Sequence, residues 1–231
     1  MSTKKNLIER WKPYNNLSLV LKKGTGFDND GLDYRGFPFA DSHAKKNIKG
    51  IKLEDVNFLY ANFENCMFTK GVFKNCVFET TNFKEIGLWD CTFIECKFIK
   101  TDFQNAMMGV NTVYQDCVFD TCKLKGKYFN FGSQAKFLDC TFSKCDIRSA
   151  WILSVIFENS KFESKFANIR FSGIKEANLR GKKEFPATFK NCDMKNSMFK
   201  SLEIMDGAKL ENTVLPNQES IRFNDDRTYY E

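Results

Sequence analysis

The sequence has few of the residues on which catalysis and membrane insertion depend. Among 231 residues there are one histidine and four prolines, and no apolar run approaches the roughly 18 residues of a membrane span. The amino-terminal residues MSTKKNLIERWKPYNN lack the apolar core and small-residue cleavage site of a signal peptide. We therefore expect a cytoplasmic protein without a membrane segment.

The scarcity of catalytic side chains argues against an enzyme. His43, the one histidine, has no evident nucleophile or acid beside it. The segment DNDG at 28–31 starts like a calcium loop, but its fifth position is Leu32 and no glutamate follows at the twelfth. The sequence has no glycine-rich phosphate loop either. It thus predicts no catalytic residue, no cofactor and no metal site.

The formal net charge of +6 raises the question of nucleic-acid binding, so its distribution matters. Residues 1–50 hold ten basic and five acidic side chains, residues 51–216 hold 23 and 20, and residues 217–231 hold two and four. The excess is therefore spread thinly over the central region. We expect no nucleic-acid partner.

Phenylalanine is abundant, with 25 copies, and its spacing is regular. Residues five apart scatter around an α-helix and fall on opposite faces of a flat strand, so neither element explains the pattern. The chain must instead turn a corner every five residues, as a repeat protein does. The predicted inward centres are Phe58, Phe63, Phe68, Phe73, Phe78, Phe83, Leu88, Phe93, Phe98, Phe103, Met108 and Val113, then Phe119, Leu124 and Phe129, then Phe137, Phe142, Ile147, Ile152, Phe157 and Phe162, and, after an irregular stretch at 163–178, Leu179, Phe189, Met194, Phe199, Ile204, Leu210 and Leu215.

A small residue stands two positions before most centres, and all nine cysteines occupy this position. We expect buried, free thiols there, since stacked strands about 4.8 Å apart exceed the Cβ separation of about 3.5–4.5 Å that a disulfide needs. The C-x4-C pairs, such as Cys91 with Cys96 and Cys117 with Cys122, lack the further ligands of a tetrahedral zinc site. One column of thiols is predicted to contain Cys76, Cys96, Cys117 and Cys140.

The pentapeptides ANFEN, TNFKE, TDFQN, ANLRG and AKLEN resemble the repeats of the pentapeptide-repeat family. The resemblance implies an all-β fold, a right-handed quadrilateral β-helix with one pentapeptide on each side of the coil. It covers residues 48–216, with residues 1–47 as an amino-terminal cap or irregular segment and residues 217–231 as a tail. At 20 residues per coil this gives about eight coils and a solenoid about 40 Å long.

The best-known functional branch of this family comprises bacterial proteins that bind DNA gyrase or topoisomerase IV by mimicking DNA and so confer antibiotic resistance. The present sequence departs from that branch because its repeat region is slightly basic and no predicted face reads as acidic. A topoisomerase-interacting protein that gives resistance or immunity to a topoisomerase poison therefore stands as the alternative function.

One predicted face of the solenoid is apolar, while the next is polar. Contiguous exposed apolar side chains are typical of interfaces, so the sequence predicts a protein partner or a homodimer. Cover by the protein's own termini is the competing interpretation. The same five-residue spacing predicts that Lys127 points inward. The outward residues of the apolar face are Met67, Trp89, Met107, Val110, Tyr128, Phe131, Trp151 and Leu153.

The amino-terminal end reads as a cap for the solenoid. Residues 3–12 are typical of a short helix that starts after Thr3 and ends before Pro13. It would present Leu7, Ile8 and Trp11 to the first coil, which otherwise exposes its core. The motif FPF at 37–39 predicts the start of the coils.

Overall fold

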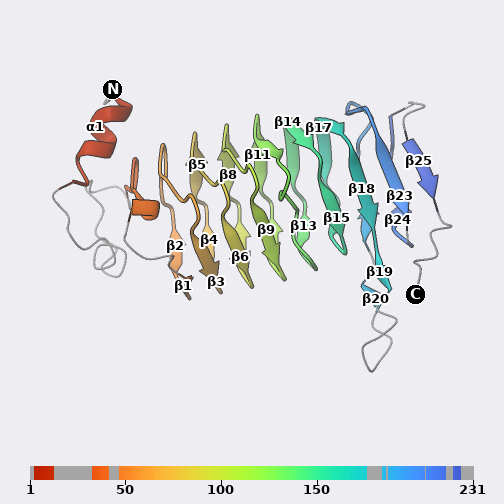
Figure 1. Ribbon diagram of the computed structural model, residues 1–231, viewed down its shortest axis with the longest axis horizontal. Helices are drawn as coiled ribbons and strands as arrows, with labels where there is room; N and C mark the ends of the chain where they lie inside the picture. Colours follow the sequence, from red (N-terminus) through yellow and green to blue (C-terminus); the bar gives the residue numbers. More distant parts are fainter. Residues whose placement is uncertain are drawn as a thin grey trace.

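The computed structural model describes residues 3–12, 33–41, 47–175, 184–185, 187–205, 207–216 and 221–224. In this part of the chain the strands stack into a rod, with helix α1 at one end and strand β25 near the other (Figure 1). The rod is a parallel β-solenoid of about eight turns, which confirms the predicted all-β fold class. No described helix is long and apolar enough to cross a membrane.

The rod has four faces of parallel strands. The first face contains β2 (Lys52–Glu54), β4 (Val72–Lys74), β7 (Thr92–Ile94), β10 (Val113–Gln115), β13 (Lys136–Leu138), β16 (Ile156–Glu158), β21 (Thr188–Lys190) and β24 (Lys209–Glu211). The second face contains β5 (Val77–Glu79), β8 (Lys97–Ile99), β11 (Val118–Asp120) and the first halves of β14 (Thr141–Arg148) and β17 (Lys161–Ala167). The third face contains β12 (Lys123–Lys125), the second halves of β14 and β17, and β22 (Met198–Phe199). The fourth face contains β1 (Asn47–Lys49), β3 (Met67–Thr69), β6 (Gly87–Trp89), β9 (Met107–Val110), β15 (Trp151–Leu153), β18 (Ile169–Ser172), β23 (Leu202–Met205) and β25 (Ile221–Asn224).

The chain turns from face to face through residues in the left-handed backbone region. Twenty-three described non-glycine residues have a positive φ, between 47° and 61°. Most of them stand two positions after a core centre, as Lys100 follows Phe98. Asparagine and aspartate tolerate this conformation better than other non-glycine residues, and they supply twelve of the 23. A left-handed corner after every third strand residue is what produces the five-residue period.

Stacked aromatic rings fill the interior. On the second face the Phe78 and Phe98 rings lie 4.9 Å apart at 6°, and the Phe98 and Phe119 rings 4.7 Å apart at 8°. On the first face the Phe93 and Tyr114 rings lie 4.9 Å apart at 5°. These separations match the roughly 4.8 Å between hydrogen-bonded strands. Each turn therefore places its rings directly on those of the turn before.

The cysteine, threonine and serine side chains among the small inward residues donate hydrogen bonds to backbone carbonyls of the preceding turn. Cys96 Sγ lies 3.4 Å from the carbonyl oxygen of Phe73, and Thr101 Oγ1 lies 2.6 Å from that of Phe78. Cysteine, threonine and serine therefore serve the same purpose at this position. All nine cysteines are buried and free. The predicted column of Cys76, Cys96, Cys117 and Cys140 is confirmed by the strand register.

A bulge in β9 shifts the repeat by one residue. Gly109 adopts a φ of 125°, and the register of β6 with β9 changes at this point. As a result Tyr114 enters the core, where its hydroxyl donates to the carbonyl oxygen of Met108 at 2.8 Å. Val113, predicted to be a centre, is half-buried instead. That prediction was wrong because the extra residue lies before Val113 and not after it.

A second irregularity follows β12. Phe129 and Phe131 are both buried, and Asn130 between them pairs with Met107. Phe131 therefore takes the core position of the fourth face, and its predicted outward orientation was wrong. Lys127, predicted to point inward, is exposed because it lies in the extra turn that precedes Phe129.

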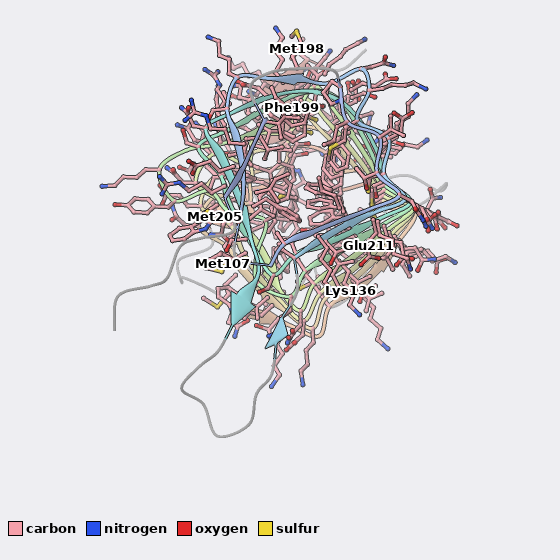
Figure 2. The ribbon with its side chains drawn as sticks, turned by 90° about the vertical axis from the view of Figure 1, so that its right-hand side faces the viewer. Met107, Lys136, Met198, Phe199, Met205 and Glu211 are labelled. Carbon is pink, nitrogen blue, oxygen red and sulfur yellow. The ribbon has the colours of Figure 1, made fainter. Side chains whose placement is uncertain are left out.

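The irregular stretch at 163–178 begins with a missing residue. Phe162 and Phe166 are both buried but stand only four positions apart, and β17 runs from the second face to the third without a left-handed corner. Phe166 and Phe171 are core residues that the five-residue count did not find. Beyond them, β19 (Ile174–Lys175) and β20 (Glu184–Phe185) pair antiparallel and project from the rod (Figures 1 and 2).

The amino-terminal helix is present as predicted. Helix α1 (Lys4–Glu9) is capped by Thr3, whose side chain accepts from the Asn6 backbone N–H at 3.3 Å. Leu7 and Trp11 are buried, whereas Ile8, also predicted to face the coils, is exposed. Leu7 and Trp11 stand four positions apart and so lie on the same side of the helical turn. Ile8 directly follows Leu7, and its side chain points about 100° away from that of Leu7 around the helix axis.

Strand pairing extends beyond residues 48–216. Asp33 and Pro38 form bridges with the first full turn, the 3-10 helix η1 (Phe39–Asp41) follows, and β25 pairs with β23 at the other end. The predictions about His43, the DNDG segment and the ANLRG pentapeptide fall outside the described residues.

Candidate functional site

The predicted apolar residues lie along the fourth face. Strand register aligns Met67 with Gly87 and Gly87 with Met107, and it aligns Thr69 with Trp89 and Trp89 with Val110. In a strand, residues on either side of an inward centre point outward together. Met67 is exposed, and Trp89, Met107 and Val110 are half-buried. These four side chains form a continuous patch over three turns.

Trp89 lies flat on this patch. A Cβ atom added to Gly87 would come within 2.3 Å of the Trp89 ring. The indole therefore covers the glycine of its own strand and presents its outer side to solvent. Only a glycine leaves room for the ring in this orientation, so Gly87 and Trp89 act as a pair. A flat, half-exposed indole is a surface that a partner protein can cover with little loss of side-chain freedom.

The remaining members of the site lie within the irregular segment after β12 or beyond it. Tyr128 is 66% exposed and Trp151 is 45% exposed, while Leu153 is half-buried. An open groove of about 480 Å³ adjoins Trp151, and Lys127 and Phe129 belong to its lining. Phe131 lies beneath this surface and contributes no exposed area. Seven of the eight predicted residues are thus at least partly accessible on or beside the fourth face.

Polar side chains bound the apolar residues along the rod. At one end Thr69 Oγ1 donates to Asn47 Oδ1 at 2.7 Å. At the other end Arg170, one strand beyond Trp151, donates from Nε to Glu203 Oε2 on the following strand at 3.2 Å. An apolar centre with a polar rim is the arrangement of protein–protein interfaces. Among the described residues, no group of three or more histidine, cysteine, aspartate or glutamate side chains is placed to hold a metal ion.

Charges elsewhere on the surface are mixed. At the corner between the first and second faces, the exposed carboxylates of Asp55, Glu95, Asp116 and Asp139 share one column with Asn75. Lys74 lies next to this column and forms an ion pair with Glu54 at 2.7 Å.

Two exposed apolar side chains of the solenoid lie outside the predicted site. Met198, on β22 of the third face, and Val214 are each 52% exposed. Both stand one position before a predicted centre, where the five-residue count turns a side chain outward, but neither belongs to the predicted apolar face. The buried Phe199 beside Met198 was correctly predicted as a core centre.

Comparison with known proteins gives distant similarities. The family described as the SV2A/B/C luminal domain matches residues 32–103, less than half of the chain. No curated protein sequence matches the chain significantly. Among solved structures, full-length QnrB1, a plasmid-mediated fluoroquinolone resistance protein, is 15% identical with a TM-score of 0.40, covering 83% of this chain and 91% of its own.

A second solved structure is HetL, a pentapeptide-repeat protein involved in the regulation of heterocyst differentiation in the cyanobacterium Nostoc sp. strain PCC 7120. It is 14% identical with a TM-score of 0.40, covering 87% of this chain and 92% of its own. The five-residue repeat and the stacked parallel sheets give the present chain the β-solenoid fold of the pentapeptide-repeat proteins.

Proposed function

We propose that this protein is a non-catalytic binding or scaffold protein that recognises a protein partner, or a second copy of itself, through the fourth face. The observation that carries the proposal is the continuous row of accessible Met67, Trp89 and Met107, with Trp151 further along the same face. Scattered apolar side chains are normal on soluble proteins, but a contiguous patch usually marks an interface.

The predicted residues of the fourth face have the length and residue types of an interface. They span turns that begin with β3 and end with β15, which at about 4.8 Å per turn makes the row roughly 20 Å long. Tryptophan, tyrosine and methionine are enriched at interface centres, where their burial contributes most of the binding free energy. The aligned strands fix the backbone beneath these side chains, so little conformational freedom is lost on binding.

The double variant Trp89→Glu with Trp151→Glu tests the proposal. Both side chains point away from the core, so the far-ultraviolet circular dichroism and the melting temperature should stay close to those of the wild type. Recovery of a partner in a pull-down, or dimerisation measured by sedimentation, should fall at least about tenfold, because two buried interface anchors are typically worth more than 1.4 kcal/mol.

A matched control places the same charges on the second face. Val77 and Val118 are half-buried outward residues there, and Val77→Glu with Val118→Glu should leave association unchanged. Equal association by wild type and the tryptophan variant would contradict the proposal. A large fall in melting temperature for the tryptophan variant alone would show that another part of the same chain covers the patch.

A second candidate function is interaction with a bacterial topoisomerase by DNA mimicry. The column of Asp55, Glu95, Asp116 and Asp139 is the observation in its favour, since stacked carboxylates can imitate a phosphate backbone. The neighbouring Lys74 works against it. A supercoiling assay with purified gyrase, with and without a poison, decides between the two functions, because a fourth-face binder leaves gyrase unaffected.

A further inference from the structure

The missing corner residue in β17 opens a groove on the third face. In the neighbouring turns the corner positions are held by Lys144, with a φ of 54°, and by Asn196. In the turn between them, Ser164 is buried and no residue projects at the corner. The result is an open groove of about 1330 Å³ that Lys144 and Asn196 both line.

Ser164 makes this short turn compatible with the solenoid. Its hydroxyl donates to the carbonyl oxygen of Phe142 at 2.9 Å and accepts from the Cys145 backbone N–H at 3.1 Å. Its own N–H donates to Ser197 Oγ at 3.3 Å. Side-chain bonds thus replace the backbone bonds of a regular corner. The groove is a fixed feature of the fold because the groups beneath it are hydrogen-bonded.

Basic side chains dominate the charge of the groove. Its lining contains Lys144, Arg148, Lys165 and Lys200 against two carboxylates. Within the described residues, the ammonium groups of Lys144, Lys165 and Lys200 have no carboxylate within ion-pair distance, and all three side chains are exposed. Three ammonium groups of one sign in one hollow raise the local concentration of anions.

Both carboxylates of the lining are already paired inside the protein. Asp146 accepts hydrogen bonds from Lys125 and Arg148, and Glu163 accepts from Lys161 and Asn196. The bond from Arg148 lowers the pKa of Asp146. These carboxylates therefore stay ionised and bound to their partners, and they leave the three lysines available for another molecule.

The groove also presents an apolar surface. Met198 lines it with a half-exposed side chain, while Phe166 and Phe199 form its floor. Figure 2 shows Met198 on the outside of the rod with Phe199 beneath it. A ligand that matches this lining carries negative charges around an apolar side chain.

We infer that this groove binds an acidic polypeptide segment whose acidic residues pair with Lys144, Lys165 and Lys200 and whose apolar side chain contacts Met198. The lysines come from three successive turns, so the basic surface is roughly 10–15 Å long, the length of three to five extended residues. The acidic side chains Glu64 and Glu85 of the same face lie several turns nearer the amino terminus, outside the groove. A nucleic acid would need a longer basic track and exposed aromatic rings for its bases, and the described lining has no exposed aromatic ring.

Fluorescence anisotropy tests this inference with a labelled ten-residue peptide, EEDELEEDEE. The wild type should bind this peptide more tightly than its amide counterpart QQNQLQQNQQ, and the affinity should fall as the salt concentration rises. The variant Lys144→Glu, Lys165→Glu, Lys200→Glu should bind at least about tenfold more weakly, since three ion pairs of about 0.5 kcal/mol each are lost.

The control variant Lys52→Glu, Lys97→Glu, Lys136→Glu makes the same change in net charge on the first and second faces, where these lysines are exposed. It should keep the wild-type affinity. Equal losses in the two triple variants would overturn the inference, because they would show attraction by net charge alone. Failure of the wild type to prefer the acidic peptide would also overturn it.

Two further measurements identify the kind of ligand. Replacing the central leucine of the peptide by glycine should weaken binding to the wild type. The Met198→Gln variant should bind the leucine and glycine peptides with equal affinity. Single-stranded DNA of ten nucleotides should bind more weakly than the acidic peptide, and tighter binding of the DNA would overturn the assignment of a polypeptide. The fourth-face variant Trp89→Glu with Trp151→Glu should bind the peptide normally, so this groove and the fourth face can be tested separately.

Discussion

At the scale of single residues, the corners are where the sequence accepts backbone strain. A left-handed conformation costs a non-glycine residue roughly 1–2 kcal/mol, and β-branched residues tolerate it worst. Thr80, with a φ of 52°, and Thr121, with a φ of 57°, are β-branched residues at such corners. The strand hydrogen bonds on both sides of each corner hold these threonines in place.

Thr80→Gly should therefore stabilise the protein. The gain is about 0.5–1 kcal/mol, the relief of left-handed strain less the greater conformational freedom of glycine in the unfolded chain. Chemical denaturation with urea measures it as a higher midpoint. Thr92→Gly, within strand β7, should lower the midpoint, because glycine weakens a strand. A lower midpoint for both variants would show that the corner conformation of Thr80 carries no strain.

The direction of most core side chains could be predicted because it depends on position within the pentapeptide. Phe78 and Phe98 face inward for this reason, and so do the cysteines two positions before the centres. The prediction failed where an extra residue lies close to two apolar neighbours. Of Val113 and Tyr114, only Tyr114 enters the core, whereas Phe129 and Phe131 are both buried. Hydrophobicity does not distinguish these two cases, and only strand register shows which side chains enter the core.

At the scale of elements, the amino-terminal cap is held by one buried carboxylate. Asp33 accepts from Arg10 at 2.8 Å and from Arg35 at 2.6 Å, and its side chain is 8% exposed. Trp11 of the same cap packs edge-on against Phe37 with ring centroids 4.6 Å apart. The ion pairs thus connect helix α1 to the chain segment that begins the solenoid.

Asp33→Asn should detach this cap, since it removes the buried negative charge to which both guanidinium groups donate. We expect a loss of about 2–4 kcal/mol in the stability of the cap. The fluorescence of Trp11, in a background with Trp89→Phe and Trp151→Phe, reports the change through exposure of the indole. The far-ultraviolet spectrum of the strands should stay unchanged, and an unaltered Trp11 signal would contradict the role assigned to Asp33.

The pH dependence of the cap has a definite sign. Burial by itself raises the pKa of Asp33, but the hydrogen bonds from Arg35 and Arg10 outweigh it and hold the pKa well below its ordinary value. A lowered folded-state pKa contributes stability that is present above the unfolded value of about 3.9 and is lost as the pH falls below it. The difference between wild type and Asp33→Asn should therefore be largest above pH 4 and shrink towards pH 2.

At the scale of the whole molecule, the two surfaces described above differ in how far the sequence could predict them. The fourth-face residues Trp89 and Trp151 stand at outward positions of regular pentapeptides, so counting found them. The groove at Lys165 and Met198 arises from one missing residue after Phe162. A missing residue has no side chain whose type could indicate a groove. The groove forms only when the short turn is stacked between two regular turns.

The stacked thiols also give the whole rod a predictable response to alkaline conditions. Burial raises the pKa of Cys66 to about 12 and that of Cys192 to about 11, against about 8.5 for an unfolded thiol. The folded state therefore keeps its protons where the unfolded state loses them. Such groups contribute stability in full below the unfolded pKa, and this contribution is lost as the pH rises towards the folded pKa.

The free energy of unfolding should accordingly be nearly constant from pH 6 to 8 and fall steeply above about pH 9, with a slope of at most about 1.4 kcal/mol per pH unit for each buried thiol. Urea denaturation at each pH measures this fall. The variant Cys96→Ser with Cys192→Ser should show a shallower fall. Serine does not titrate in this range and, as Ser160 shows with its bond of 3.2 Å to the Phe137 carbonyl oxygen, it can donate the hydrogen bond that a cysteine makes at this position. Identical slopes for the two proteins would mean that lysine or tyrosine titration, and not the thiol columns, sets the alkaline limit of the rod.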